Sequence, residues 1–299
     1  MRLRELRLQE DRIFKRFLKP DEYHLSAYHT ASIFIWKKLF RISYVILDGS
    51  LCIFFQDRHS CFMHLPPLGQ GICPGVINKC FAIMDKLNKN NQISRIENVE
   101  ERDLAFFRKL GYVYYAKPAD YLYNREDILS FRGRRFKSKR ADYNYFVKHH
   151  DFKFRPYCRE DKVACLDLYL RWSDERKRRF SDSLYRAMLE DNYSCQELAL
   201  ENFLRLGLIG YVVEIKDKLS AYSCGFRLNS EIFCVLSEVC SLGYRGISQY
   251  IFSEFCRCLT GFRYINAMDD SGLVNLRRVK LSYRPARLID NYIIQRRYA

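Results

Sequence analysis

Two neighbouring carboxylates and a lysine stand close together in the stretch NAMDDSGLVNLRRVKLSYRP, residues 266–285. Asp269 and Asp270 follow the predicted strand FRYIN, and a Ser-Gly turn separates them from a predicted short helix. At about 100° per residue, Lys280 shares a helix face with the apolar residues, whereas Arg278 lies on the opposite face. Because a buried lysine needs a partner, this arrangement predicts a site for proton transfer and charge stabilisation.

The same residues also permit a purely structural interpretation. The two aspartates could cap the following helix, whose N-terminus carries a partial positive charge. Lys280 could pack its aliphatic stem against the protein and keep its ammonium group in water. The sequence leaves both interpretations open.

The composition limits the class of protein. A chain of 299 residues is long enough for two domains, and 48% hydrophobic with 15% aromatic residues can form a substantial core. Lysine and arginine exceed aspartate and glutamate by 51 to 35, a formal net charge of +16. This excess indicates a polyanionic partner, such as nucleic acid, nucleotide phosphates or an anionic membrane surface. The sequence does not specify the oligomeric state.

Twelve cysteines are scattered along the chain without a C-x-x-C pair or the spacing of zinc ligands. Residues 1–20 are basic and mildly amphipathic, so they could dock on the domain as a helix or touch a membrane. They lack the apolar stretch of a secretory signal, and no run approaches the ~20 apolar residues of a membrane span. We therefore predict no bound metal and a reduced, cytoplasmic protein, with a peripheral position at the inner face of the membrane as the alternative.

The predicted elements divide the chain into two similar halves. Residues 1–124 are predicted to form a helix, a hairpin turning at Asp48-Gly49, a strand, a glycine turn, and then helix, strand, helix and strand. Residues 125–299 repeat this order, with extra helices before three antiparallel strands. The sequence thus predicts an α/β (α+β) protein of two tandem domains, each with a mixed, largely antiparallel sheet flanked by helices.

Basic residues gather in three places. The segment FRGRRFKSKR at 131–140 contains six, the segment RWSDERKRR at 171–179 is a second cluster, and arginines between 277 and 287 form a third. Together they favour a phosphate-binding groove, with a solvated helix surface as the alternative.

The order of elements, with a glycine turn after a central strand, resembles the GNAT acyltransferase fold. In that superfamily the turn R/Q-x-x-G-x-G/A presents backbone amides to the pyrophosphate of coenzyme A. The corresponding stretch here keeps Gly246, but Gly243 replaces the Arg/Gln and Ser248 replaces the last small residue. As a coenzyme A signature this turn is degraded.

A second resemblance covers nearly the whole chain. The first half contains SIFIWKKLFRISY and LPPLGQG, and the second contains LSFRGRRFKSKRADYNYF and the spacing L-R-x-x-K-x-x-Y-x-P. The chain is similar to the DUF2156 family, and so to the C-terminal synthase domain of phosphatidylglycerol lysyltransferases, a tandem pair of GNAT folds. The positions in pattern in the second half are Gly133, Lys139, Arg140, Asn144, Glu238, Arg245, Gly246, Asn266, Asp269, Asp270, Leu276, Arg277, Lys280, Tyr283 and Pro285.

The chain departs from the family at two places near these residues. The family pattern at the strand end is closer to N-R-E-D-D, whereas Ala267 and Met268 stand here between Asn266 and the aspartates. After Glu238 the family usually has a lysine, whereas this chain has Val239. Charged positions of the family pattern are therefore absent near the predicted site.

The resemblance implies transfer of an aminoacyl group from aminoacyl-tRNA to a hydroxyl or amine, on a phosphatidylglycerol-like lipid or another acceptor, without a cofactor. Lys280, with Arg277, is the candidate for stabilising the oxyanion that forms at the ester carbonyl. Asp269, Asp270 or Glu238 would accept the proton of the acceptor. Glu238 alternates with Cys234 and Leu236 on its strand, which predicts that it faces inward. Its structural alternative is an ion-pair partner.

Tyr283 could protonate the leaving hydroxyl, or it could be a packed aromatic residue before Pro285. The acceptor arm of tRNA would need a basic groove, for which the candidates are Arg134, Arg135, Lys137, Lys139 and Arg140. The other candidates for substrate binding are Asn144, Arg245, Gly246 and Asn266. Two further functions stay open: an N-acyltransferase that uses acyl-coenzyme A, and a non-catalytic module that binds RNA or a membrane surface.

Overall fold

The structure is a computed structural model that describes residues 3–297. The chain divides into two compact units, of which the first comprises the described residues up to Asp120 together with those from Leu288 onward. The second unit is Tyr121–Arg287. The predicted division after residue 124 lies near the first boundary, but the last strand, which the sequence assigned to the second domain, belongs to the first unit.

The sheet of the first unit has the strand order β1-β2-β3-β4-β5-β12. Only the contact between β4 and β5 is parallel, at Met63 and Ile96, and the other pairs are antiparallel. The predicted hairpin is present, with its turn at Asp48 and Gly49, both at positive φ. These strands are β1 (Arg4–Glu5), β2 (Arg41–Leu47), β3 (Ser50–Gln56), β4 (Cys61–Met63), β5 (Arg95–Glu100) and β12 (Arg287–Gln295).

One face of this sheet is covered by α3 (Pro74–Leu87) and α4 (Leu104–Lys109). The helix α3 begins at Pro74, where the missing backbone N–H of proline costs nothing, and it buries Phe81 against the strands. Two short helices come earlier in the chain, α1 (Asp11–Phe17) and α2 (Thr30–Phe34). Because Leu6 and Phe14 are buried, the described part of the basic N-terminal segment docks on the protein, and residues 1–2 lie outside the described residues.

The sheet of the second unit runs from the end of β6 (Val113–Asn124) through β11, β10, β9 and β8 to β7. The pair β10–β11 is parallel and the others are antiparallel, so both units have mixed, largely antiparallel sheets as predicted. The strands are β7 (Lys153–Pro156), β8 (Ile209–Ile215), β9 (Lys218–Arg227), β10 (Ile232–Cys240) and β11 (Tyr264–Asn266).

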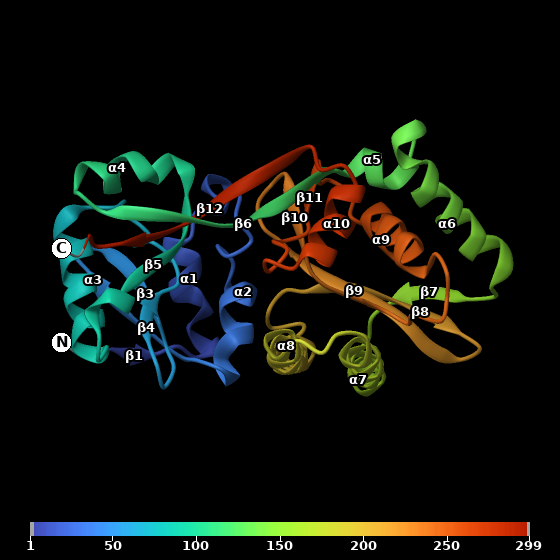
Figure 1. The fold of residues 1–299 in the computed structure, drawn as a ribbon, viewed down its shortest axis with the longest axis horizontal. Coiled ribbons are helices and arrows are strands. Elements are labelled where there is room, and N and C mark those ends of the chain that lie inside the picture. Colours follow the sequence, from blue (N-terminus) through green and yellow to red (C-terminus); the bar gives the residue numbers. More distant parts are fainter. Residues whose placement is uncertain (1–2, 298–299) are drawn as a thin grey trace. The chain divides into compact units, whose positions relative to one another are not determined.

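Helices cover both faces of this second sheet. Figure 1 shows α9 and α10 on one side of strands β8–β10, and α7 and α8 on the other. Phe233 and Phe255 belong to the apolar cluster under α9, whereas Ser237 donates to Gln196 of α8 on the opposite face, at 2.7 Å. The helices are α5 (Arg125–Ser130), α6 (Lys137–His149), α7 (Lys162–Arg179), α8 (Ser183–Glu201), α9 (Ile247–Cys258) and α10 (Val274–Ser282).

Candidate active site

Glu238 on β10 is the centre of the candidate site. The pairing of β10 with β9 shifts register between Val235 and Ser237, which is a β-bulge. The bulge breaks the alternation that the sequence predicts, so that Ser237 points to α8 and Glu238 points to the face of Val235 and α9. Glu238 is therefore half-buried on the α9 side of the sheet, whereas simple alternation would have placed it on the same face as Cys234.

Two lysines act on this carboxylate. Burial raises the pKa of Glu238 to about 8, although the positive charges of Lys139 and Lys280 oppose the rise. Glu238 has no hydrogen bond or ion pair to any residue between 3 and 297. It is thus a recessed carboxyl group whose raised pKa suits it to take part in proton transfer.

Lys139 comes from the first turn of α6 and was predicted as a phosphate ligand. Its Nζ lies 3.9 Å from the centre of the Tyr283 ring, a cation–π contact. Burial lowers the pKa of Lys139, an effect that Asp142 and Glu238 partly offset. Among the described residues no hydrogen bond or ion pair of Lys139 is found, so the structure places a weakly held cation beside Glu238.

Lys280 turns toward the site, but its ammonium group is occupied by the backbone. It donates to the carbonyl oxygens of Ala267 at 2.5 Å, Met268 at 3.2 Å and Asp269. These contacts stabilise the segment after β11, where Met268 adopts a φ of 60°. Lys280 therefore has a structural role here, while its charge reaches Glu238.

The two aspartates follow the structural interpretation. Asp269 Oδ1 accepts the backbone N–H of Ser271 at 2.7 Å, and Asp270 Oδ1 accepts that of Gly272 at 3.0 Å. Asp270 Oδ2 also accepts the hydroxyl of Tyr121 at 2.6 Å. Both carboxylates thus hold the turn before α10, whereas no such backbone contact of Glu238 is found among the described residues.

Tyrosines form the wall of the site. Tyr283 is buried among Phe131, Tyr123 and Phe252, and burial together with Glu238 raises its pKa. The position of Tyr283 agrees with the alternative prediction that it is a packed aromatic residue before Pro285. Tyr121 and Tyr123 were not predicted, although they alternate on one strand: Tyr121 lies 5.6 Å under Lys280 Nζ, and Tyr123 donates to the Lys280 carbonyl at 2.9 Å.

The other predicted basic residues do not join this cluster. Arg135 pairs with Asp127 at 3.0 Å, and Arg140 donates to the carbonyls of Phe131 and Gly133. The exposed residues are Arg134, Lys137, Asn144 and Arg277. A phosphate groove along this surface stays a prediction.

The predicted turn at Gly246 is a helix–helix contact. Gly246 has a φ of 86°, and a Cβ there would lie 2.0 Å from the carbonyl oxygen of Asp142 in α6. Arg245 pairs with the side chain of the same Asp142 at 2.9 Å. Asn266 is fully buried, and its side chain accepts the N–H of Met268 at 2.7 Å. These residues position elements around the site, so their assignment to substrate binding has no support in the geometry.

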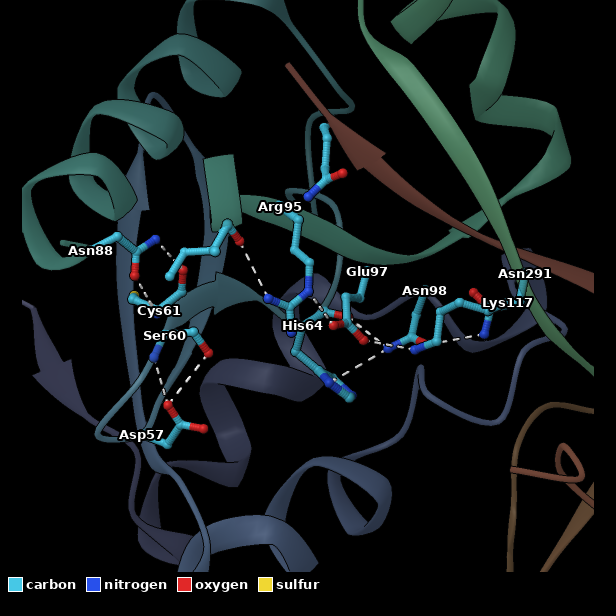
Figure 2. A network of polar contacts seen from close by, with 12 residues as sticks. Asp57, Ser60, Cys61, His64, Asn88, Arg95, Glu97, Asn98, Lys117 and Asn291 are labelled. Carbon is cyan, nitrogen blue, oxygen red and sulfur yellow. Dashed lines mark hydrogen bonds and ion pairs between the residues drawn. The ribbon is translucent and has the colours of Figure 1, made fainter. Parts of the chain in front are cut away.

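The first unit contains a buried polar network that the sequence did not reveal. Figure 2 shows Asn98 between His64 and Lys117. The Asn98 side chain donates to the His64 carbonyl at 2.9 Å and accepts from Lys117 at 3.0 Å and from Asn291 at 3.0 Å. It joins the ends of β4 and β5, which pair only at Met63 and Ile96, to β6 and β12.

The charges in this network are balanced. Burial lowers the pKa of His64 to about 3, so the ring is neutral. Burial would raise the pKa of Glu97, but Lys117 and Arg95 outweigh it and lower that pKa. We therefore interpret this network as one that stabilises the packing of four strands. The candidate active site lies in the second unit.

Comparison with solved structures defines the class of protein. A tandem GNAT protein from the clavulanic acid biosynthesis pathway superposes with a TM-score of 0.54 and 11% identity, over 98% of this chain and 97% of that chain. A conserved protein of unknown function from Bacteroides thetaiotaomicron has a TM-score of 0.86 and 24% identity, over 99% of both chains. The protein thus has a tandem GNAT-like fold, as predicted.

The chain belongs to the family "Phosphatidylglycerol lysyltransferase, C-terminal", whose model matches residues 21–295. The C-terminal domain (DUF2156) of a protein named as a lysylphosphatidylglycerol synthetase from Agrobacterium fabrum has a TM-score of 0.64 and 11% identity, over 98% of this chain and 93% of that chain. The predicted family is therefore confirmed, and the family and fold are those of acyltransferases.

A curated relative, an uncharacterised protein of Mycoplasmoides gallisepticum, is 26% identical over 181 residues, which is 59% of this chain. The match spans 56% of that relative's length. No helix in residues 3–297 is both long and apolar enough to cross a membrane.

Proposed function

We propose that this protein transfers an aminoacyl group from aminoacyl-tRNA to a hydroxyl or amine acceptor, with Glu238 as the proton acceptor. The observation that carries the proposal is the half-buried carboxyl group of Glu238, whose pKa is raised to about 8 and which lies beside two lysines. A proton acceptor works best when its pKa is near the working pH, and an ordinary glutamate is too weak a base.

The reaction assigns a step to each group. The acceptor oxygen or nitrogen forms a bond to the ester carbonyl carbon, and its proton passes to Glu238. The carbonyl oxygen becomes negative, and Lys139 stabilises it because its ammonium group is held by a ring rather than by an anion. The bond to the ribose oxygen then breaks, and the proton returns from Glu238 to that leaving oxygen. No cofactor is required, since the aminoacyl ester is already activated.

Two lines of support favour tRNA as the donor. The family name describes lysyl transfer to phosphatidylglycerol, and its resemblance implies an aminoacyl-tRNA donor. The net charge of +16 favours binding of a polyanion of this kind. A phosphatidylglycerol-like lipid is the acceptor that the family name supports, and the amino acid is not specified by any residue described above.

Transfer of label from a mixed pool of radiolabelled aminoacyl-tRNAs tests the proposal, with total lipid and total soluble extract as acceptors. We expect label in one acceptor fraction, and a loss of about 100-fold or more in kcat/KM for Glu238→Gln. Glu231→Gln, an exposed glutamate next to the same strand, is the matched control and should retain activity.

A pH profile separates a proton acceptor from a merely structural group. The activity should rise with pH toward a value near 8, and Lys139→Met should move the rise to higher pH because a positive charge that lowers the pKa of Glu238 is removed. The amino group of the substrate also titrates near pH 8. The decisive result is therefore the difference between the pH profiles of the wild type and of Lys139→Met, because the substrate contributes equally to both. Equal profiles would contradict the role of Glu238.

Saturable coenzyme A binding without aminoacyl transfer would replace the proposal by the acyl-coenzyme A alternative.

A further inference from the structure

The hairpin of α7 and α8 ends in a tip with exposed basic and apolar side chains. The two helices lie side by side, and the hydroxyl of Tyr169 donates to the Leu189 carbonyl at 2.8 Å. The helix α7 ends at Arg179 and α8 begins at Ser183, with Asp182 as its N-cap. The tip is defined here as residues 176–186.

The tip is strongly basic. It contains five basic residues and one acidic residue, Asp182, whose side chain accepts the N–H of Tyr185 at 2.7 Å. Arg178 and Arg179 are exposed, and neither forms an ion pair within the described part of the chain. Basic residues in the last turn of a helix offset its dipole, but this effect alone does not require so many.

The tip also exposes two large apolar side chains. Leu184 is 70% exposed and Phe180 is 38% exposed. A single exposed apolar residue is ordinary, but two of them within four positions and next to unpaired arginines form an amphipathic surface. Both lie outside the buried core, and Phe180 contacts the ring of Tyr185 in the same tip, with the ring centroids 5.4 Å apart.

We infer that the tip of the α7–α8 hairpin docks on an anionic lipid surface. The arginines would bind the phosphates of lipid headgroups, and Phe180 with Leu184 would enter the boundary between headgroups and acyl chains. Nucleic acid shares the phosphates, but the aliphatic side chain of Leu184 cannot stack on bases as aromatic rings do. The pair of apolar residues therefore favours a membrane over RNA.

This inference goes beyond the proposed function and does not depend on it. Docking requires neither the aminoacyl donor nor Glu238, and a tip that docks would supply a lipid surface to whatever reaction the site performs. Its test can therefore be made without any donor, so that failure of docking and failure of transfer are separate results.

The test is co-sedimentation of the full chain with vesicles of phosphatidylcholine, with and without phosphatidylglycerol. We expect binding only to the anionic vesicles, weakened by added salt. Arg178→Glu together with Arg179→Glu should reduce partitioning at least tenfold, and Phe180→Ser together with Leu184→Ser should reduce it several-fold. Leu204→Ser is the control: Leu204 is 85% exposed but follows the other end of α8, so partitioning should not change.

Each outcome decides the inference. All substituted side chains are exposed, and thermal melts verify that the variants fold like the wild type. Absence of binding by the wild type, or equal binding by the double arginine variant, would overturn the inference. If the arginine substitutions weaken binding of uncharged tRNA while vesicle binding is unchanged, the tip is an RNA surface instead. A loss with Leu204→Ser as large as with the apolar tip variant would show non-specific adsorption and would equally overturn it.

Discussion

Glu238 illustrates how the surroundings of one residue create its chemistry. The carboxyl group is half-buried on the α9 side of β10, and burial outweighs the attraction of Lys139 and Lys280. A position that raises the pKa of an acid also costs stability, because the folded protein must keep a proton that the unfolded chain releases. Function and stability are therefore linked at this residue.

The linkage gives a prediction for Glu238→Gln. The folded-state pKa of about 8 lies above the ordinary value of 4.5, so the stability is lost as pH rises from about 4.5 to about 8. Glutamine does not titrate, so this variant should match the wild type near pH 5 and be more stable at pH 8. Its Tm at pH 8 should be higher by at least ~2–4 °C, the shift that about 1 kcal/mol produces in a domain of this size.

Thermal melts at the two pH values measure this difference, and Glu231→Gln serves as the control because Glu231 is exposed. A gain in Tm that is the same at pH 5 and pH 8 would mean that Glu238 does not titrate in this range. That result would also remove the basis for its role as proton acceptor.

At this scale the sequence yields candidate residues, whereas their roles depend on contacts that the sequence does not show. Glu238, Lys139 and Lys280 were all predicted as site residues, but Lys139 as a phosphate ligand and Lys280 as the oxyanion group. Their roles depend on which groups from other elements lie nearby, such as the three carbonyls that occupy Lys280. Such long-range contacts are not encoded in local spacing.

At the scale of elements, two glycines with nearly the same φ differ in ψ and in their surroundings: ψ is 172° at Gly133 and −6° at Gly246. Gly133 has a φ of 85°, and a Cβ added there would have no atom within 4 Å. Gly246 has a φ of 86°, and a Cβ there would meet α6 at 2.0 Å. Only the second glycine therefore allows α9 to approach α6.

We predict that Gly133→Ala lowers the free energy of unfolding by about 1–3 kcal/mol through backbone strain, because a φ of 85° with a ψ of 172° is a conformation that essentially only glycine adopts. Gly246→Ala should lower it by about 3 kcal/mol, because the backbone of Asp142 must also move. Urea unfolding of both variants measures the difference. A loss of only about 1 kcal/mol for Gly246→Ala, which is the cost of its left-handed conformation alone, would show that α6 and α9 are not in close contact in solution.

Elements were predictable where one periodic pattern determined them, as in α3 and the β2–β3 hairpin. The bulge in β10 was not, because pairing with β9 creates it and no residue type marks it. The predicted apolar stripe of α10 is wrong in part: Val279 is 51% exposed, and the helix has no buried residue. The short helix is held by Lys280 and the turn before it rather than by an apolar face.

At the scale of the whole molecule, the chain returns at its end to the unit in which it began. Ile294 of β12 is fully buried in the core of the first unit and pairs with Ile96 of β5. A boundary drawn along the sequence cannot show this, because strand pairing joins segments almost 200 residues apart. Each unit is therefore defined by contacts and not by continuity of the chain.

This arrangement predicts where a change near the C-terminus acts. Ile294→Ala removes a buried side chain and should lower stability by about 2–4 kcal/mol. Hydrogen exchange should increase in β5 and α3, which contact Ile294 in the same core, and not in β9 or β10 of the second unit. Leu288→Ala, at a position that is 43% exposed, should change little and serves as the control. Faster exchange in β10 with β5 unchanged would mean that the last strand belongs to the second unit after all.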